Sequence, residues 1–304
     1  MFRNCLSLKK RDAYGDRHLR IDAHQHFWKL ERCEYHWLTP EAGILYRDYA
    51  PEDLRPLLRK NNIDKSIVVE SAQTATETDY LLELAKKTDF IAGVVGWLNL
   101  DTENFEDEFG SYAANRHIVG IRPIHQGRDT FYHPYNDDRI DDKWLVRPRV
   151  IESLRIIANK DFPVDLNVMP RHLPDVLTIL KEIPNLRCVI DHIGKPNIAS
   201  KEVEPWSELM SELATYRKAY CKLSGMITEA GGNWKPTAIA PYVSQIIDVF
   251  GLDRVMYGSD WPVCLKAGSY DEQIEALQRV LADRLDENSE TLVFGGNAAR
   301  FFKL

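Results

Sequence analysis

The chain has 304 residues, of which 44% are hydrophobic and 28% are charged, a composition typical of a globular protein. Its net charge of −7 and the absence of clustered basic residues argue against nucleic acid as a partner. No apolar stretch approaches the roughly 20 residues of a membrane span. The five cysteines show no regular spacing, so we expect free thiols and a cytoplasmic protein.

Residues 1–18 are polar and locally basic and lack the apolar core of a signal peptide, so we predict an N-terminal extension followed by one domain over residues 19–304. In that domain, short apolar runs alternate with segments of helical spacing. The predicted strands are Leu19–Phe27, Lys65–Gln73, Ile91–Leu100, Ile118–Gln126, Phe162–Met169, Leu186–Gly194, Tyr220–Met226 and Val255–Pro262. Helical patterns begin at Pro51 and cover Thr78–Leu84, Val150–Ile157, Val176–Ile183, Ala240–Phe250 and Ile274–Leu281.

This alternation predicts an α/β fold with a parallel sheet. Runs such as Ser66–Val69 and Cys188–Ile190 are apolar on both faces, as expected for strands covered on both sides. Eight such units in one domain favour a (β/α)8 TIM barrel with long βα loops over its C-terminal face. The rival is an open doubly wound sheet with a glycine-rich first turn, but the turn after the first strand contains no glycine.

Two connections, residues 28–50 and 127–144, are longer than a simple barrel needs. Both follow strands, which places them on the C-terminal face, where the active sites of TIM barrels lie. The first contains Trp28, Tyr35, His36, Trp37, Tyr46 and Tyr49. So many aromatic residues favour an ordered lid or pocket wall over a disordered loop.

Polar residues occur near the C-terminal ends of several predicted strands. His24 and His26 stand two residues apart in the first strand, so we expect them to share a face with Asp22. Further polar residues follow other strands, at Arg122, His192, Ser224 and Asp260. Burial of these groups without partners would be costly, and a shared polar site at the barrel mouth removes that cost.

In the motifs at these strand ends, the chain resembles the amidohydrolase superfamily. Within it, the chain resembles the amidohydrolase 2 branch, which contains sugar and aromatic-acid lactonases. The resemblance rests on Asp22–Trp28, Gly120–Pro123, Asp191–Pro196, Tyr257–Pro262 and Gly295–Arg300. It covers nearly the whole chain after Arg20 and implies a TIM-barrel hydrolase. The L-fuconolactonase-like and L-rhamnonolactonase-like members of the branch look most similar.

Two departures from the superfamily pattern bear on metal binding. Binuclear members use a carbamylated lysine on the fourth strand, where this chain has Arg122. The fifth-strand histidine of many mononuclear members is also missing, so the resemblance implies that His192 serves instead. A site with one metal ion, or with none, follows.

The resemblance implies lactone hydrolysis, in which a water is deprotonated and a carbonyl is polarised. Asp260 is the expected general base. His24, His26 and His192, together with Asp260, would ligate one divalent ion, with zinc as the first choice. In the metal-independent alternative, the three histidines would polarise the carbonyl directly.

We expect other residues to contact the substrate. The candidates are Arg122, Trp28, Tyr35, Trp37, Gln73, Asn167, Trp234 and Trp261, with His125 and His133 as weaker ones. Arg122 would bind an oxygen through its guanidinium or form an ion pair inside the barrel. Asp191 precedes His192 and is expected to point to the opposite face. Lys195 either reaches the site or belongs only to the loop.

The favoured function is the opening of a sugar lactone, L-fucono- or L-rhamnonolactone-like, to its aldonic acid. One alternative is a lactonase for an anionic aromatic-derived lactone, with Arg122 as the main cation and Arg47, Arg171 or Lys195 as helpers. Another is a metal-dependent decarboxylase of aromatic acids, against which the missing fifth-strand histidine weighs. A catalytically inactive binding barrel is the fourth, and the intact set of three histidines and Asp260 argues against it.

Overall fold

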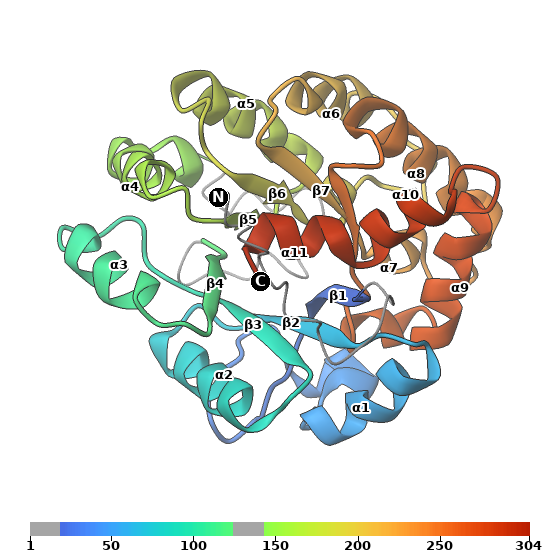
Figure 1. Cartoon of the computed structure of the whole chain (residues 1–304), viewed down its shortest axis with the longest axis horizontal. Helices are drawn as coiled ribbons and strands as arrows, with labels where there is room; N and C mark the ends of the chain where they lie inside the picture. Colours follow the sequence, from blue (N-terminus) through green and yellow to red (C-terminus); the bar gives the residue numbers. More distant parts are fainter. Residues whose placement is uncertain (1–18, 124–142) are drawn as a thin grey trace, which may run out of the picture.

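The computed structural model describes residues 19–123 and 143–304, in which eight parallel strands form one sheet in chain order (Figure 1). The strands are β1 (Ile21–Gln25), β2 (Lys65–Val69), β3 (Ile91–Gly96), β4 (Ile118–Ile121), β5 (Val164–Leu166), β6 (Cys188–Ile190), β7 (Ala219–Leu223) and β8 (Val255–Tyr257). The predicted N-terminal extension, most of the second long connection, His125 and His133 lie outside the described residues.

Helices surround the sheet (Figure 1). They are α1 (Pro51–Lys60), α2 (Ala75–Lys87), α3 (Phe105–Ala113), α4 (Pro148–Asn159), α5 (Leu173–Glu182), α6 (Trp206–Ala214), α7 (Met226–Ala230), α8 (Pro236–Phe250), α9 (Tyr270–Leu281), α10 (Glu287–Thr291) and α11 (Asn297–Phe302). Strands and helices alternate as the sequence predicted. Each predicted strand is present but shorter, so most of the polar residues assigned to strand ends lie in the loops that follow.

Backbone contacts between the first and last strands close the barrel. Gln25 and Trp261 form a parallel bridge just beyond β8. The His26 amide donates to the Trp261 carbonyl at 2.7 Å, and the Asp260 amide donates to the His24 carbonyl at 2.8 Å. Closure confirms the TIM barrel over an open sheet, and it places the backbone of Asp260 beside the histidine pair.

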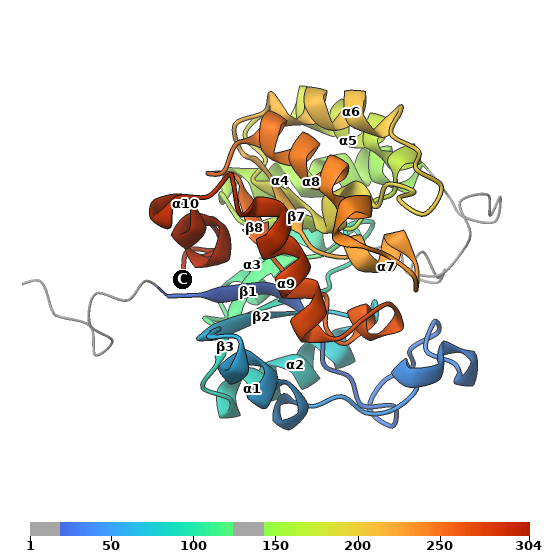
Figure 2. The ribbon, with the colours of Figure 1, turned by 90° about the vertical axis from the view of Figure 1, so that its right-hand side faces the viewer.

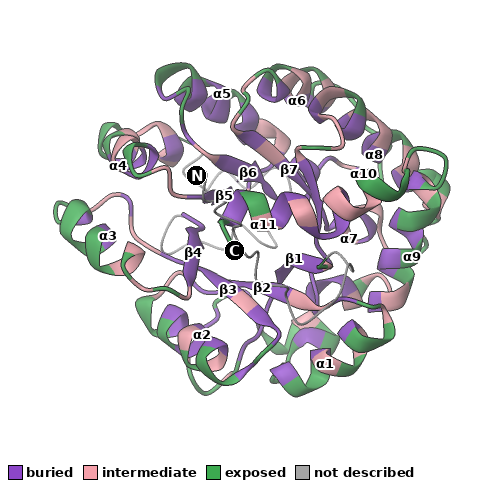
Figure 3. Ribbon diagram, viewed as in Figure 1, coloured by how far each residue is buried: buried purple, intermediate pink, exposed green. Residues whose placement is uncertain are grey.

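Apolar side chains fill the end of the barrel at which the strands begin. Helix α11 lies across the ring of strands in Figure 1, and Figure 2 shows the C-terminus at the end where β1 begins. Figure 3 shows the strands almost entirely buried. One apolar cluster joins these strands to α11 and contains Ile21, Ala23, Ile67, Val69, Val95, Val119, Val189, Met256, Ala298, Phe301 and Phe302. Among the described residues, this end of the barrel is therefore an apolar core.

The prediction that Asp22 shares a face with the two histidines is wrong. The register of β1 against β2 shifts between Asp22 and Gln25, and such a bulge breaks the simple alternation of side chains. The Asp22 carboxylate accepts a hydrogen bond from the Ser259 amide at 2.8 Å and one from the Tyr270 hydroxyl on α9 at 3.1 Å. Asp22 therefore connects the end of β8 to an outer helix.

The first long connection is ordered, as its aromatic content predicted. Trp28 and Tyr49 pair through both backbone groups, at 3.0 and 3.1 Å, and a short 3-10 helix covers Pro40–Leu45. Within the described ranges, no helix is long and apolar enough to cross a membrane. Cys188 and Cys221 are buried free thiols, as expected.

Candidate active site

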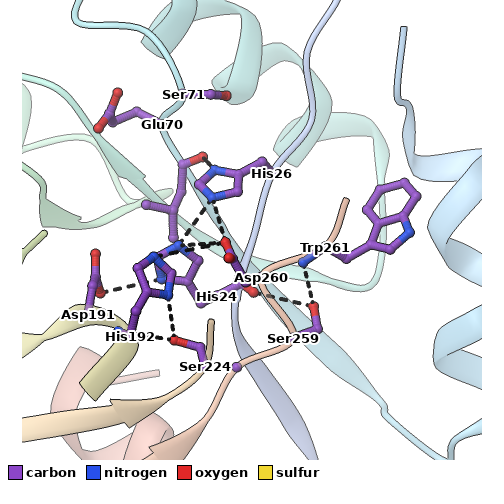
Figure 4. A network of polar contacts seen from close by, with 12 residues as sticks. His24, His26, Glu70, Ser71, Asp191, His192, Ser224, Ser259, Asp260 and Trp261 are labelled. Atoms are coloured by element: carbon purple, nitrogen blue, oxygen red, sulfur yellow. Dashed lines mark hydrogen bonds and ion pairs between the residues drawn. The ribbon is translucent and has the colours of Figure 1, made fainter. Parts of the chain in front are cut away.

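Three imidazoles and one carboxylate meet at the C-terminal mouth of the barrel (Figure 4). The Nε2 atoms of His24 and His26 are 3.2 Å apart. The Asp260 Oδ1 atom lies 3.4 Å from Nε2 of His26 and 3.8 Å from Nε2 of His24. His192 reaches the same oxygen from another side, with its Nε2 at 3.9 Å. The sequence grouped these four residues, and the structure brings them together.

His192 reaches the cluster because the chain leaves β6 in an unusual conformation. The backbone is left-handed at His192, Ile193 and Lys195, with φ values of 52°, 49° and 49°. The Ser224 hydroxyl lies 2.9 Å from Nδ1 of His192. Gly225 lies against the imidazole so closely that a Cβ atom there would be 2.8 Å from the His192 Cβ. Glycine at 225 therefore leaves space for His192.

Burial sets the charges of the cluster. It lowers the pKa of His192 to about 4, and it lowers the pKa of His24 well below its ordinary value, assisted by the charge of Lys222. Burial alone would raise the pKa of Asp260, but the surrounding imidazoles outweigh it and hold this pKa well below its usual range. At neutral pH the site therefore holds an ionised carboxylate beside His24 and His192, both uncharged.

A layer of buried ions lies beneath the cluster. Lys222 of β7 donates to Asp165 of β5 and lies 3.1 Å from Asp191. The Asp191 carboxylate is 3.4 Å from Nδ1 of His24. The prediction that Asp191 points to the opposite face is therefore wrong, because β6 ends at Ile190 and strand alternation no longer applies. Asp191 supports His24 from within the barrel.

Arg122 belongs to the same layer. Its Nε donates to Glu70 at 2.6 Å, another of its nitrogens donates to the Glu70 carbonyl, and a third lies 3.5 Å from Asp191. The side chain is fully buried. Of the two readings of Arg122, the geometry favours the ion pair inside the barrel over direct contact with substrate.

The ligand atoms of His24, His26 and Asp260 all lie within 4.8 Å of one another, a grouping that could hold a single divalent cation. Zinc–nitrogen bonds of about 2.0–2.1 Å place two tetrahedral ligand nitrogens roughly 3.3 Å apart, and the two Nε2 atoms are separated by 3.2 Å. The His26 Nδ1 donates to the Val69 carbonyl at 2.8 Å, which leaves the Nε2 lone pair facing the cluster. Three imidazoles and a carboxylate are a donor set suited to zinc.

Both tautomers of His24 find partners. If Nδ1 carries the proton, it faces the Asp191 carboxylate at 3.4 Å and leaves Nε2 free to bind a metal. If Nδ1 accepts from Lys222, whose Nζ is 3.1 Å away, then Nε2 carries the proton and donates to His26. The second arrangement corresponds to the metal-independent alternative.

Three of the predicted sugar-stacking tryptophans are engaged elsewhere. Trp28 has no exposed surface, and its indole donates to the Arg47 carbonyl at 2.7 Å. The Trp261 indole points away from the histidines in Figure 4 and packs against Phe27 and Tyr49. Trp234 donates to the Ala267 carbonyl at 2.9 Å and lines a separate surface pocket over α9. Hydrophobic packing accounts for the first two.

The remaining candidates lie after β2, in the loop before α1, or after β5. Trp37 is buried, and its indole donates to the Ser71 carbonyl, two residues beyond the Val69 carbonyl that His26 contacts. Tyr35 is also buried, whereas Gln73 and Asn167 are half-buried. The Asn167 amide oxygen is buried without a hydrogen-bond partner among the described residues. A substrate hydroxyl could satisfy that acceptor.

The sequence did not predict two features of this region, its supporting ions and a pocket of whose lining only His192, Asp260 and Lys195 were candidates. The supporting ions Glu70, Asp165 and Lys222 lie within strands or at their ends, and charged residues in otherwise apolar strands were the available signal. A pocket beside His192 and Asp260 is lined by Lys195, Gly225, Thr228, Glu229 and Val263. Thr228 and Glu229 belong to a short helix that no pattern predicted.

Comparisons with known proteins identify the family of this chain. The amidohydrolase family model matches residues 21–304. The chain is 38% identical to an L-fucono-1,5-lactonase of Burkholderia ambifaria and 35% identical to one of Burkholderia multivorans, each over 94% of this chain and 96% of the relative. A crystal structure of a Burkholderia multivorans amidohydrolase with bound zinc superposes with a TM-score of 0.84 at 33% identity, covering 94% of this chain and 99% of that one. The chain therefore belongs to the amidohydrolase family.

Proposed function

We propose that this protein is a lactonase that hydrolyses a sugar lactone of the L-fucono-1,5-lactone kind to its aldonic acid. The observation that carries the proposal is the buried Asp260 carboxylate, 3.4–3.9 Å from three imidazole nitrogens at the mouth of the barrel. The similarity to two L-fucono-1,5-lactonases over almost the full chain supports the substrate class. Buried free thiols at Cys188 and Cys221 support a cytoplasmic location.

In this proposal Asp260 is the general base. Its ionised oxygen accepts a proton from a water as the water oxygen bonds to the lactone carbonyl carbon. The ring C–O bond then breaks, and the proton held by Asp260 passes to the ring oxygen, which becomes a hydroxyl. The product is one hydroxy acid, which ionises in solution, so lactone and water are fully accounted for.

The histidines position and polarise the carbonyl. His192 is uncharged at neutral pH, so its ring can bind an electrophile or donate a hydrogen bond according to its tautomer. We propose that His24, His26, His192 and Asp260 together hold one divalent ion, with zinc preferred. When bound, such an ion would act as a Lewis acid and lower the pKa of its water to about 7.

The burial of Arg122, the main cation expected for an anionic aromatic-derived lactone, favours a neutral substrate. Recognition of an aromatic dicarboxylate would require several cations that are available to the ligand. Arg122 is fully buried and is engaged by Glu70 and Asp191. The proposed contacts for sugar hydroxyls are instead Asn167, Gln73, Tyr35 and Trp37.

A panel of lactones tests the proposal. Acid release is followed with a pH indicator for L-fucono-1,5-lactone, other aldonolactones and an anionic pyrone dicarboxylate. We expect turnover of aldonolactones and none of the dicarboxylate. The reverse pattern would replace the sugar-lactonase proposal with the anionic alternative. Metal analysis of the purified protein, followed by chelation and zinc re-addition, tests the proposed ion separately.

A further inference from the structure

The pocket beside Asp260 contains a lysine that the mechanism above does not use. His192 and Asp260 form one part of its lining, and Lys195, Thr228 and Glu229 form the rest together with Gly225 and Val263. His24 and His26 are buried deeper in the barrel. Among the described residues, this pocket therefore opens directly beside the reacting carboxylate.

The backbone directs Lys195 to this pocket. The residues from His192 to Lys195 follow a left-handed path, and the Lys195 amide donates to the His192 carbonyl at 2.8 Å. The Trp206 indole donates to the Ile193 carbonyl at 2.7 Å and fixes the middle of the turn. The turn that presents His192 therefore also presents Lys195.

Lys195 is unusually buried for a lysine, with only 8% of its surface exposed. Lysines are seldom buried to this extent unless they are paired or functional. Glu229 and Asp260 line the same pocket as Lys195, so both carboxylates share this space with the lysine. Burial lowers the pKa of Lys195.

Thr228 gives a second, independent indication of a ligand. Its Oγ1 atom is buried and has no hydrogen-bond partner among the described residues, although the residue lines the pocket. A buried hydroxyl without a partner carries an energetic cost that a bound oxygen would remove. The pocket thus presents an ammonium group and an unsatisfied hydroxyl beside the general base.

We propose that Lys195 and Thr228 form an oxyanion subsite, in which the Lys195 ammonium contacts the lactone oxygen that becomes negative during hydrolysis. This inference rests on the proposed lactonase function and deepens it. The lactone is neutral, whereas the tetrahedral intermediate and the aldonate product are anions. A cation at this position stabilises the charged species more than the substrate, and it therefore raises kcat with little effect on KM.

The test compares Lys195→Met with Lys195→Arg, Thr228→Val and the control Lys266→Met. Lys266 is an exposed lysine at the end of the short 3-10 helix Val263–Lys266, is also influenced by Glu229 and does not line the pocket. Kinetics are measured with L-fucono-1,5-lactone, and binding of L-fuconate is measured by calorimetry. Removal of one oxyanion donor typically costs about 100-fold or more in kcat.

We expect Lys195→Met to lower kcat about 100-fold with KM changed less than about threefold, and to weaken L-fuconate binding about tenfold. Lys195→Arg should restore part of kcat, Thr228→Val should lower kcat about tenfold, and Lys266→Met should match the wild type. A folded Lys195→Met enzyme with wild-type kcat, or one that differs only in KM, overturns the Lys195 assignment alone. A wild type inactive on every aldonolactone overturns the lactonase proposal itself, and this inference with it.

Discussion

The two ends of the barrel are both buried, but one is lined by apolar side chains and the other by ionisable side chains. At the end where the strands begin, Ile21, Phe301 and Phe302 belong to a continuous apolar cluster. At the other end, His24 and Asp260 belong to a group of ionisable side chains that are almost equally inaccessible to solvent. The first end gains stability from burial, whereas the second must offset the cost of burying charge.

Lys222 marks the boundary between the two ends. Its Nζ lies 5.6 Å from the centre of the Phe302 ring on one side and 3.1 Å from Asp191 and from His24 Nδ1 on the other. Layers of supporting ions and then of histidines follow above it. The barrel therefore tolerates a polar mouth because the buried ions beneath it pair with one another, Lys222 with Asp165 and Asp191, and Arg122 with Glu70 and Asp191. Variants at the two ends should accordingly affect different measurements.

The largest effect is expected for Asp260→Asn. The amide keeps the shape of the side chain but cannot take the proton of the attacking water, so kcat should fall by at least about 1,000-fold, near the upper range for loss of a general base. Removal of an ionised group beside the three imidazoles should leave the fold intact. Steady-state kinetics and circular dichroism measure the two quantities.

A matched control for that variant is Asp248→Asn, which removes an aspartate from the outer surface. Asp248 of α8 pairs with Arg284 in an exposed ion pair, so its loss should leave kcat unchanged. Substantial turnover by a folded Asp260→Asn enzyme would exclude Asp260 as the base. It would also contradict the expectation that variants at the polar end act on catalysis.

The opposite end should give the opposite result with Phe301→Ala. Phe301 is about 1% exposed and packs against Phe302 and Tyr220, so the substitution leaves a cavity in the apolar cluster. The free energy of unfolding should fall by about 3–5 kcal/mol. The kcat of the remaining folded protein should be unchanged. Urea unfolding and active-site-normalised kinetics test this, and a large loss of kcat in folded protein would show that the two ends are coupled.

A smaller, local effect is expected for Gly225→Ala at the mouth. Its φ of +68° strains any side-chain-bearing residue by about 1–2 kcal/mol, and the new Cβ would meet the His192 ring. The imidazole must shift from its present position, so kcat/KM should fall about tenfold, in line with the sensitivity of catalysis to small misplacements.

Gly231→Ala is the control for backbone strain. Gly231 has a φ of +82°, but a Cβ there would meet nothing within 4 Å. Both variants should lose a similar amount of stability, and only Gly225→Ala should lose activity. Equal activities would mean that the position of His192 does not depend on the space that Gly225 provides.

The sequence was most informative where local pattern determines structure. Alternating strands and helices predicted the barrel, and polar residues after apolar strands predicted the grouping of His24, His26, His192 and Asp260. It failed where the backbone departs from regular geometry. The bulge in β1 turned Asp22 outward, and the early end of β6 turned Asp191 inward.

The sequence also could not rank the aromatic candidates. From the sequence, Trp28, Trp37 and Trp261 look equally suitable for a sugar, and only the structure shows that all three are buried in the main apolar cluster. The sequence also did not predict long-range ion pairs such as Lys222 with Asp165, because these two residues are 57 positions apart in the chain. Side-chain orientation and long-range pairing depend on tertiary contacts, which spacing alone does not encode.

The smallest effect should come from an ion cluster on the rim of the apolar end. Asp161 lies about 3.0 Å from both Lys218 and Lys303 and also pairs with Arg187. Partial burial would raise the pKa of Asp161, but these cations outweigh it and hold the pKa well below its usual value. A carboxyl with a lowered folded-state pKa stabilises the fold above its unfolded pKa of about 3.9, and the stabilisation is lost as pH falls toward the folded value. Asp161→Asn should therefore cost about 1 kcal/mol or less at pH 7, because solvent screens the cluster, and the difference from wild type should shrink steadily below about pH 4. Urea unfolding at pH 7 and pH 3 measures this, and a deficit that stays constant over that range would show that the carboxylate charge is not the source of the stability.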